Sequence, residues 1–164
     1  MRKCFWLLST LWVLILSWCG WSMNVIEYND TFVGLVNECT ESATAIYNTF
    51  QADWTIDSIK ELVQSSIDIC RAGQEKAVNL WDYDKDSILK DEVVKLLSLE
   101  AEYMENFLAT SVYRNIDDIT EEDKTAYDWA VNTLYQAEAA LNKQFTNLQD
   151  AQEAFAAKHW LNLE

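Results

Sequence analysis

The sequence contains no proline and only three glycines among its 164 residues. All-β sandwiches and barrels place these residue types at their many tight turns, so their scarcity argues against such folds. Half of the residues are apolar, which is enough for one compact domain with a hydrophobic core. The composition therefore favours a single domain built from long helices.

Histidine is almost absent too, since His159 is the only one. It stands beside Lys158 near the end of the chain, where we expect it to cap the last carbonyls of a helix. The sequence has no Cys-x-x-Cys-His haem motif, no glycine-rich phosphate loop and no Glu-x-x-His pair of the kind found in di-iron bundles. One terminal histidine leaves little general-base chemistry near neutral pH. We therefore predict a protein that is not an enzyme and uses no cofactor.

Positive charge is scarce: 12 Lys and Arg stand against 27 Asp and Glu, for a net charge of −15. Removal of Arg2 and Lys3 with the N-terminal segment would make it −17. Nucleic acid and anionic lipid are poor partners for such a surface. We interpret the acidic residues as the solvated faces of helices.

The N-terminus combines a basic start with a long apolar run. Arg2 and Lys3 are followed by residues without charge as far as Glu27. A basic start followed by about fifteen apolar residues is typical of a cleavable signal peptide.

The end of this run is Leu16-Ser17-Trp18-Cys19, which resembles the signal of bacterial lipoproteins. In that family a leucine stands three residues before an obligatory cysteine, and cleavage occurs just before the cysteine once its thiol carries a diacylglyceryl group. The resemblance implies that Cys19 is lipidated and that Leu16, Ser17 and Trp18 form the cleavage region. Trp18 departs from the pattern, because the residue before the cut must be small.

An uncleaved anchor is the alternative, because residues 4–21 form an apolar stretch close to the lower limit for spanning a bilayer. Both interpretations fix the domain to a membrane and place it on the outer side. The expected organisation is a signal peptide over residues 1–18, a lipidated cysteine and short tether over 19–23, and a helical bundle over 24–164.

Eight tryptophans are unusual beside three glycines, and several stand where glycine is favoured. Two flank the lipidated cysteine, and three occupy expected helix ends, where a left-handed backbone makes glycine the common residue. One hypothesis is that the source organism reads UGA codons as glycine; the alternative is that these are true tryptophans closing the ends of a bundle. The codons at these positions would decide between them: Trp18, Trp21, Trp54, Trp81 and Trp160.

Apolar residues spaced by three and four predict four helices. The first runs from about Met23 to Ala52, and the second begins at Thr55, a good N-cap. The third runs from Asp86 or Ser87 to about Tyr113, and the fourth begins at Thr120, where Asp123 completes a capping box. The last carries a seam repeating every seven residues: Tyr127, Leu134, Leu141, Leu148 and Phe155. Short connections between long helices predict an elongated, antiparallel up-down-up-down four-helix bundle.

Cys39 and Cys70 are the pair that remains once Cys4 is removed with the signal and Cys19 is lipidated. Cys39 lies fifteen residues before the turn at residue 54, and Cys70 lies sixteen residues after it. An antiparallel hairpin therefore brings the two cysteines to the same level along the helix axes. Both also fall on the inward stripe. We predict a disulfide, worth about 3–4 kcal/mol from loop closure, with two buried free thiols as the alternative.

Three aspartates have the alternate spacing found at the start of a calcium-binding loop: Asp82, Asp84 and Asp86. The match then fails, because Ser87 and Val93 occupy the positions where glycine and a bidentate glutamate belong. A helix-connecting loop with an N-cap explains these aspartates equally well. We therefore predict no metal site. Asp82, Asp84 and Asp86 are only weak candidates for metal ligands.

The closing stretch AQEAFAAKHWLNLE resembles the ending of small helical surface lipoproteins of unassigned function. We expect a non-enzymatic lipoprotein of the cell envelope, a structural or protein-interaction module whose partners are the membrane and an envelope or extracellular protein. The alternative is a binding protein for a small apolar ligand or a cation within the bundle. A filled core favours the first function, whereas an interior pocket of roughly several hundred Å³ favours the second.

Overall fold

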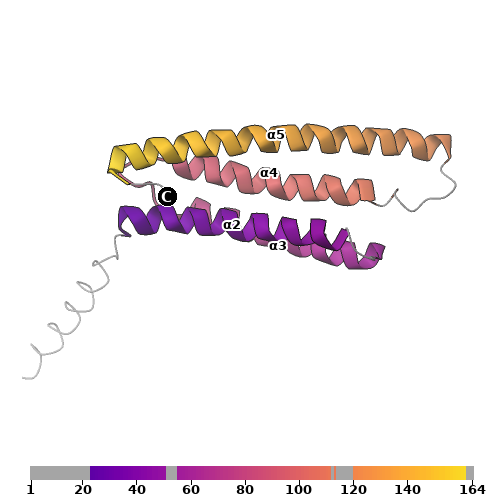
Figure 1. Cartoon of the computed structure of the whole chain (residues 1–164), viewed down its shortest axis with the longest axis horizontal. Coiled ribbons are helices and arrows are strands. Elements are labelled where there is room, and N and C mark those ends of the chain that lie inside the picture. Colours follow the sequence, from indigo (N-terminus) through magenta and orange to yellow (C-terminus); the bar gives the residue numbers. More distant parts are fainter. Residues whose placement is uncertain (1–22, 51–54, 112, 114–119, 162–164) are drawn as a thin grey trace, which may run out of the picture.

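The computed structural model describes residues 23–50, 55–111, 113 and 120–161. These residues form four helices: α2 (Val25–Phe50), α3 (Ile56–Asn79), α4 (Ile88–Ser111) and α5 (Glu121–His159). Successive helices run in opposite directions (Figure 1). The predicted all-α, antiparallel four-helix bundle is therefore confirmed.

Two helix starts coincide with the sequence signals. The Thr55 hydroxyl accepts a hydrogen bond from the backbone N–H of Ser58, and the Ser58 hydroxyl accepts one from Thr55 in return. Thr120 and Asp123 form the equivalent capping box at the start of α5. Each box satisfies two backbone donors that a helix end leaves free. Both predicted caps are confirmed.

The helices form two hairpins that share one core. In this arrangement α4 packs closely against α3 and α5, and α2 packs closely against α3 and less extensively against α4; α2 and α5 are not a closely packed pair. The core contains the predicted apolar stripes, with these members completely or almost completely buried: Tyr28, Phe32, Cys39, Ile46, Ile59, Val63, Ile67, Cys70, Leu89, Val93, Leu96 and Leu97.

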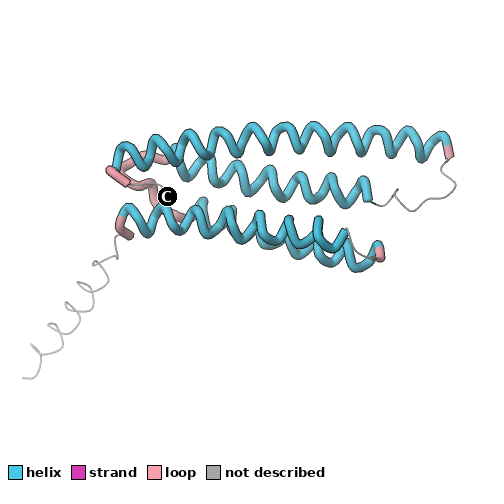
Figure 2. The backbone as a smooth tube through the Cα atoms, viewed as in Figure 1, coloured by secondary structure: helices cyan, strands magenta, loops and turns pink. Residues whose placement is uncertain are grey.

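The last helix is much longer than the others. It has 39 residues, against 24 to 26 in α2, α3 and α4, and it extends past the far end of α4 (Figure 2). The predicted seven-residue seam is consequently buried only in part. Leu141 is buried, as is Phe155, whereas the remaining seam residues are half-buried.

Within the described ranges, none of the helices is both long enough and apolar enough to cross a membrane. The apolar run at residues 4–21 lies outside those ranges, as do Leu16, Ser17, Trp18 and Cys19.

Candidate functional site

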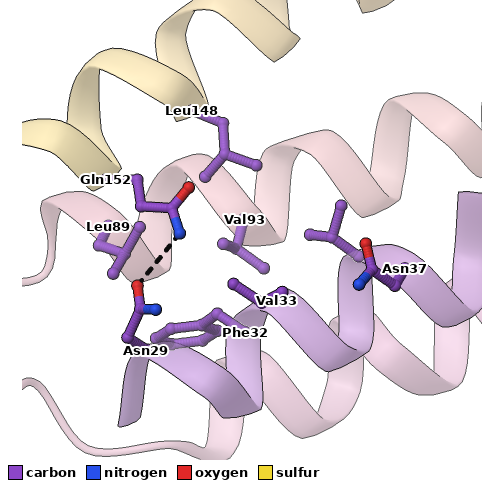
Figure 3. Close-up of a pocket in the computed structure, with 9 residues that line it drawn as sticks. Asn29, Phe32, Val33, Asn37, Leu89, Val93, Leu148 and Gln152 are labelled. Atoms are coloured by element: carbon purple, nitrogen blue, oxygen red, sulfur yellow. Dashed lines mark hydrogen bonds between the residues drawn. The ribbon is translucent and has the colours of Figure 1, made fainter. Parts of the chain in front are cut away.

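A cavity of about 130 Å³ lies between α2 and α5, and Leu89 and Val93 of α4 form part of its wall (Figure 3). It exists because α2 and α5 are not closely packed, so neither helix fills the space with its own side chains. Apolar side chains from three helices form most of the wall, and amides complete it. The lining residues are Asn29, Phe32, Val33, Val36, Asn37, Leu89, Val93, Leu148 and Gln152.

Two amides join the helices at one end of this cavity. Gln152 Nε2 donates to Asn29 Oδ1 at 3.2 Å, and Asn37 lies at the opposite end (Figure 3). Among the described residues that line the space, none is charged. Pockets for free small molecules usually measure about 300–1,000 Å³, so this cavity suits a smaller group, of the size of one aromatic or branched aliphatic side chain.

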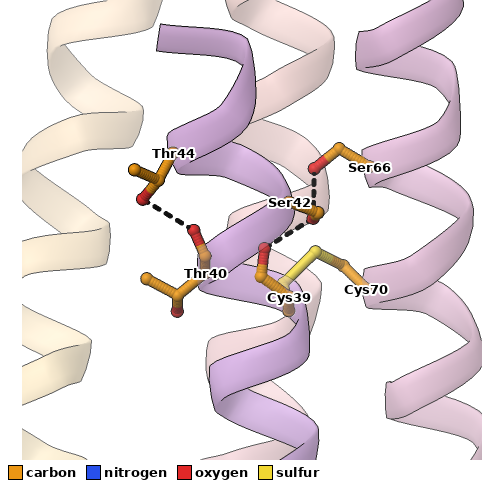
Figure 4. The surroundings of a disulfide bond; sticks show 6 residues. All are labelled: Cys39, Thr40, Ser42, Thr44, Ser66 and Cys70. Carbon is orange, nitrogen blue, oxygen red and sulfur yellow. Dashed lines mark hydrogen bonds between the residues drawn. A yellow bond between two sulfur atoms is a disulfide. The ribbon is translucent and has the colours of Figure 1, made fainter. Parts of the chain in front are cut away.

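Cys39 and Cys70 are joined by a disulfide between α2 and α3 (Figure 4), with their Cα atoms 4.8 Å apart. Both residues are buried. Beside the bond, Ser42 Oγ lies 2.6 Å from the Cys39 carbonyl, to which it donates, and 2.7 Å from Ser66 Oγ. Because the Ser42 proton is used in this way, Ser66 donates to Ser42. The pairing agrees with the prediction from the heights of the two cysteines.

The aspartates of the loop between α3 and α4 are engaged by separate partners. Asp82 pairs with Lys90, and Asp86 pairs with Lys158 at 2.8 Å. Asp86 Oδ1 also accepts from the backbone N–H of Ile88 at 3.1 Å. These two hydrogen bonds, the one from Lys158 first, lower the pKa of Asp86.

The same carboxylates do not converge on a point. In the part of the chain that the structure describes, no group of three or more His, Cys, Asp or Glu residues is arranged to hold a metal ion. The calcium-like spacing of Asp82, Asp84 and Asp86 therefore serves a helix-connecting loop, in which Asp86 caps the start of α4.

His159 does not cap the end of α5, so that prediction is wrong. Its ring packs against Phe155 and Tyr83, with centroids 4.5 Å and 5.1 Å away. Its Nδ1 lies 3.8 Å from Asp84 Oδ2, and its Nε2 is buried without a hydrogen-bond partner among the described residues. The backbone N–H of Trp160 makes the helix-ending bond to Ala156 instead.

One buried carboxylate went unnoticed in the sequence. Glu100 in α4 is only 4% exposed. Burial raises its pKa. Tyr103, one turn further along, also has a raised pKa, through burial and then through the charges of Glu138 and Glu100. Glu100 lies four residues after Leu96 and three before Tyr103. This spacing places Glu100 on the apolar stripe of the helix.

The tryptophan positions differ in backbone conformation. Trp160 has φ 58° and ψ 34°, the left-handed conformation that favours glycine, and its side chain is 92% exposed. Trp81 does not have a positive φ; it follows Leu80, which ends α3 in an extended conformation, and its ring packs near Tyr83. The predicted left-handed conformation is thus present at 160 and absent at 81. Three other positions lie outside the described residues: Trp18, Trp21 and Trp54.

Comparisons of the chain with protein-family models, curated proteins and solved structures gave no match.

Proposed function

We propose that this protein is a non-enzymatic lipoprotein, anchored by Cys19 to the outer side of a bacterial membrane, whose bundle binds another protein of the envelope. The observation that carries the proposal is the buried bond between Cys39 and Cys70. Disulfides persist in oxidising compartments outside the cytoplasm. This location agrees with the apolar N-terminal run and the lipoprotein-like signal around Cys19.

The cavity between α2 and α5 supports a protein partner over a free small ligand. Its volume of about 130 Å³ is below the usual range for ligand pockets, but it accommodates one inserted side chain. The amides of Asn29, Asn37 and Gln152 supply hydrogen-bonding groups around an apolar wall. An apolar anchor residue inserted in a small pocket is a common centre of a protein interface.

Lipidation is tested by growing cells that express the full chain with a labelled fatty acid. We expect label in the mature protein and none in a Cys19→Ser variant, whereas Cys4→Ser should keep the label because that residue leaves with the signal. A Trp18→Gly variant should be processed faster, since a small residue precedes the cut. An unlabelled protein that keeps residues 1–18 would support the uncleaved anchor instead.

The partner is tested with a photo-reactive phenylalanine analogue in place of Val33, which lies at the partly exposed edge of the cavity. Irradiation of intact cells should join the protein to one partner. The same analogue at Tyr135, which is exposed and outside the cavity, is the control and should not capture that partner. Equal capture at the two positions would contradict a role for the cavity.

A further inference from the structure

Large apolar side chains are exposed at one end of the bundle. The antiparallel arrangement brings together the start of α2, the end of α3, the start of α4 and the end of α5 (Figure 1). Ile26, Val78 and Ile88 lie within one turn of these helix ends, and each is more than half exposed. We call these three residues the apolar rim. Trp81 and Trp160 are exposed at the same end.

The N-terminal segment leaves from this same end. Met23 is the first described residue and lies two positions before the start of α2. Three residues lie between it and Cys19, so the Cα atoms of Cys19 and Met23 are at most about 14 Å apart. If the apolar run stays as an uncleaved anchor, the connection is shorter. In either form the anchor holds Met23, at the same end of the bundle as the apolar rim, within about 14 Å of the membrane-attached residue.

Charge on the loop between α3 and α4 is partly neutralised by lysines, although Glu27 and Asp91 add negative charge at the same end of the bundle. The three aspartates of the loop between α3 and α4 stand beside three lysines, Lys85, Lys90 and Lys158, and two of these lysines form ion pairs with them. A surface that keeps some negative charge is repelled by anionic lipid but not by a zwitterionic headgroup layer. The end is therefore suited to a zwitterionic bilayer surface.

We infer that the apolar rim rests in the headgroup layer of the membrane, so that the bundle stands on the bilayer by its end. Apolar side chains of this kind enter the boundary between headgroups and acyl chains and gain by leaving water. The inference rests on the proposed membrane anchoring. It does not depend on Trp81 and Trp160, because Ile26, Val78 and Ile88 remain if those two positions are glycine.

The test places a photo-reactive phenylalanine analogue at Ile26 or Ile88 of the full chain in its own membrane. The control position is Tyr135, which is exposed and lies about 36 Å along α5 from His159. After membranes are collected and irradiated, mass spectrometry should find phospholipid joined to the protein at positions 26 and 88 and not at 135. Circular dichroism of each variant checks that the helices are kept.

The outcomes separate the two proposals. A protein found in the soluble fraction before irradiation overturns the anchoring, and with it this inference. A membrane-bound protein whose positions 26 and 88 attach to another protein, or to nothing, overturns only the contact between the apolar rim and lipid. Equal attachment of lipid at position 135 also overturns it, because the bundle would then lie flat on the bilayer.

Discussion

The bond between Cys39 and Cys70 closes a loop whose ends are 31 residues apart. In the chain-entropy description, a cross-link across a loop of that length restricts the unfolded chain by about 12 cal/mol/K, which corresponds to about 3.7 kcal/mol at 25 °C. Both cysteines are buried within the core, so a reducing agent reaches the bond only when the hairpin opens. We expect the reduced protein to be less stable by about 3–4 kcal/mol, with a fall in Tm of roughly 10 °C or more.

The assay compares thermal unfolding, followed by circular dichroism, of the same protein before and after complete reduction. Reduction changes the bond and leaves the side chains in place, so a packing change contributes little to the difference. A Cys39→Ala/Cys70→Ala variant is the control, because its Tm should not respond to the reducing agent. Equal Tm values for the oxidised and reduced protein, or two alkylatable thiols in protein from the envelope, would refute the reasoning.

Three further predictions concern single side chains. Glu100→Met should stabilise the protein by about 1–2 kcal/mol at pH 7 in urea unfolding, because it removes a carboxylate whose charged form is disfavoured by burial. Since burial raises the folded-state pKa of Glu100, the gain should shrink as the pH falls and this group protonates. Glu102→Met, at an exposed position, should change stability little. Trp160→Gly should raise stability by about 1 kcal/mol by relieving a left-handed backbone, whereas Trp129→Gly, inside α5, should lower it by about 0.5 kcal/mol. A loss of stability at both positions would contradict the backbone argument. Thr120→Ala should cost about 1 kcal/mol and speed hydrogen exchange in the first turn of α5, which unchanged exchange would disprove.

Features governed by nearby residues were predictable from the sequence. Thr55 and Thr120 were identified as helix caps because a cap involves residues only three positions apart. The apolar spacing along α2 and α3 placed Cys39 and Cys70 on facing stripes, because a helix turns by a fixed amount per residue. The disulfide then followed from the shared turn between the two helices.

Features governed by packing between distant segments were not predictable in the same way. The pairing of Asp86 with Lys158 joins residues 72 apart, and no local pattern indicates it. The cavity depends on how far α2 lies from α5, which periodicity does not determine. His159 was expected at carbonyls of its own helix, but the aromatic rings of Tyr83 and Phe155 offered a larger apolar contact.

Glu100 shows a different limit, since its position was visible and its burial was not. It lies on the same stripe as Leu96 and Tyr103, but glutamate is rarely buried without a partner. A rule based on residue type therefore excludes it from the core. A rule based on the spacing of apolar residues along α4 places Glu100 in the core, and in the structure Glu100 is buried.

The bond between α2 and α3 also decides how the protein responds to a pulling force. Tension applied between the N-terminal segment and the far end of the chain passes from Cys39 directly to Cys70 through the sulfur atoms. The roughly 30 residues between them carry no load and cannot be drawn out, which withholds about 100 Å of extensible chain. If the domain is held by its N-terminus and pulled by a partner, the first hairpin gives only a short extension before the covalent bond takes the force.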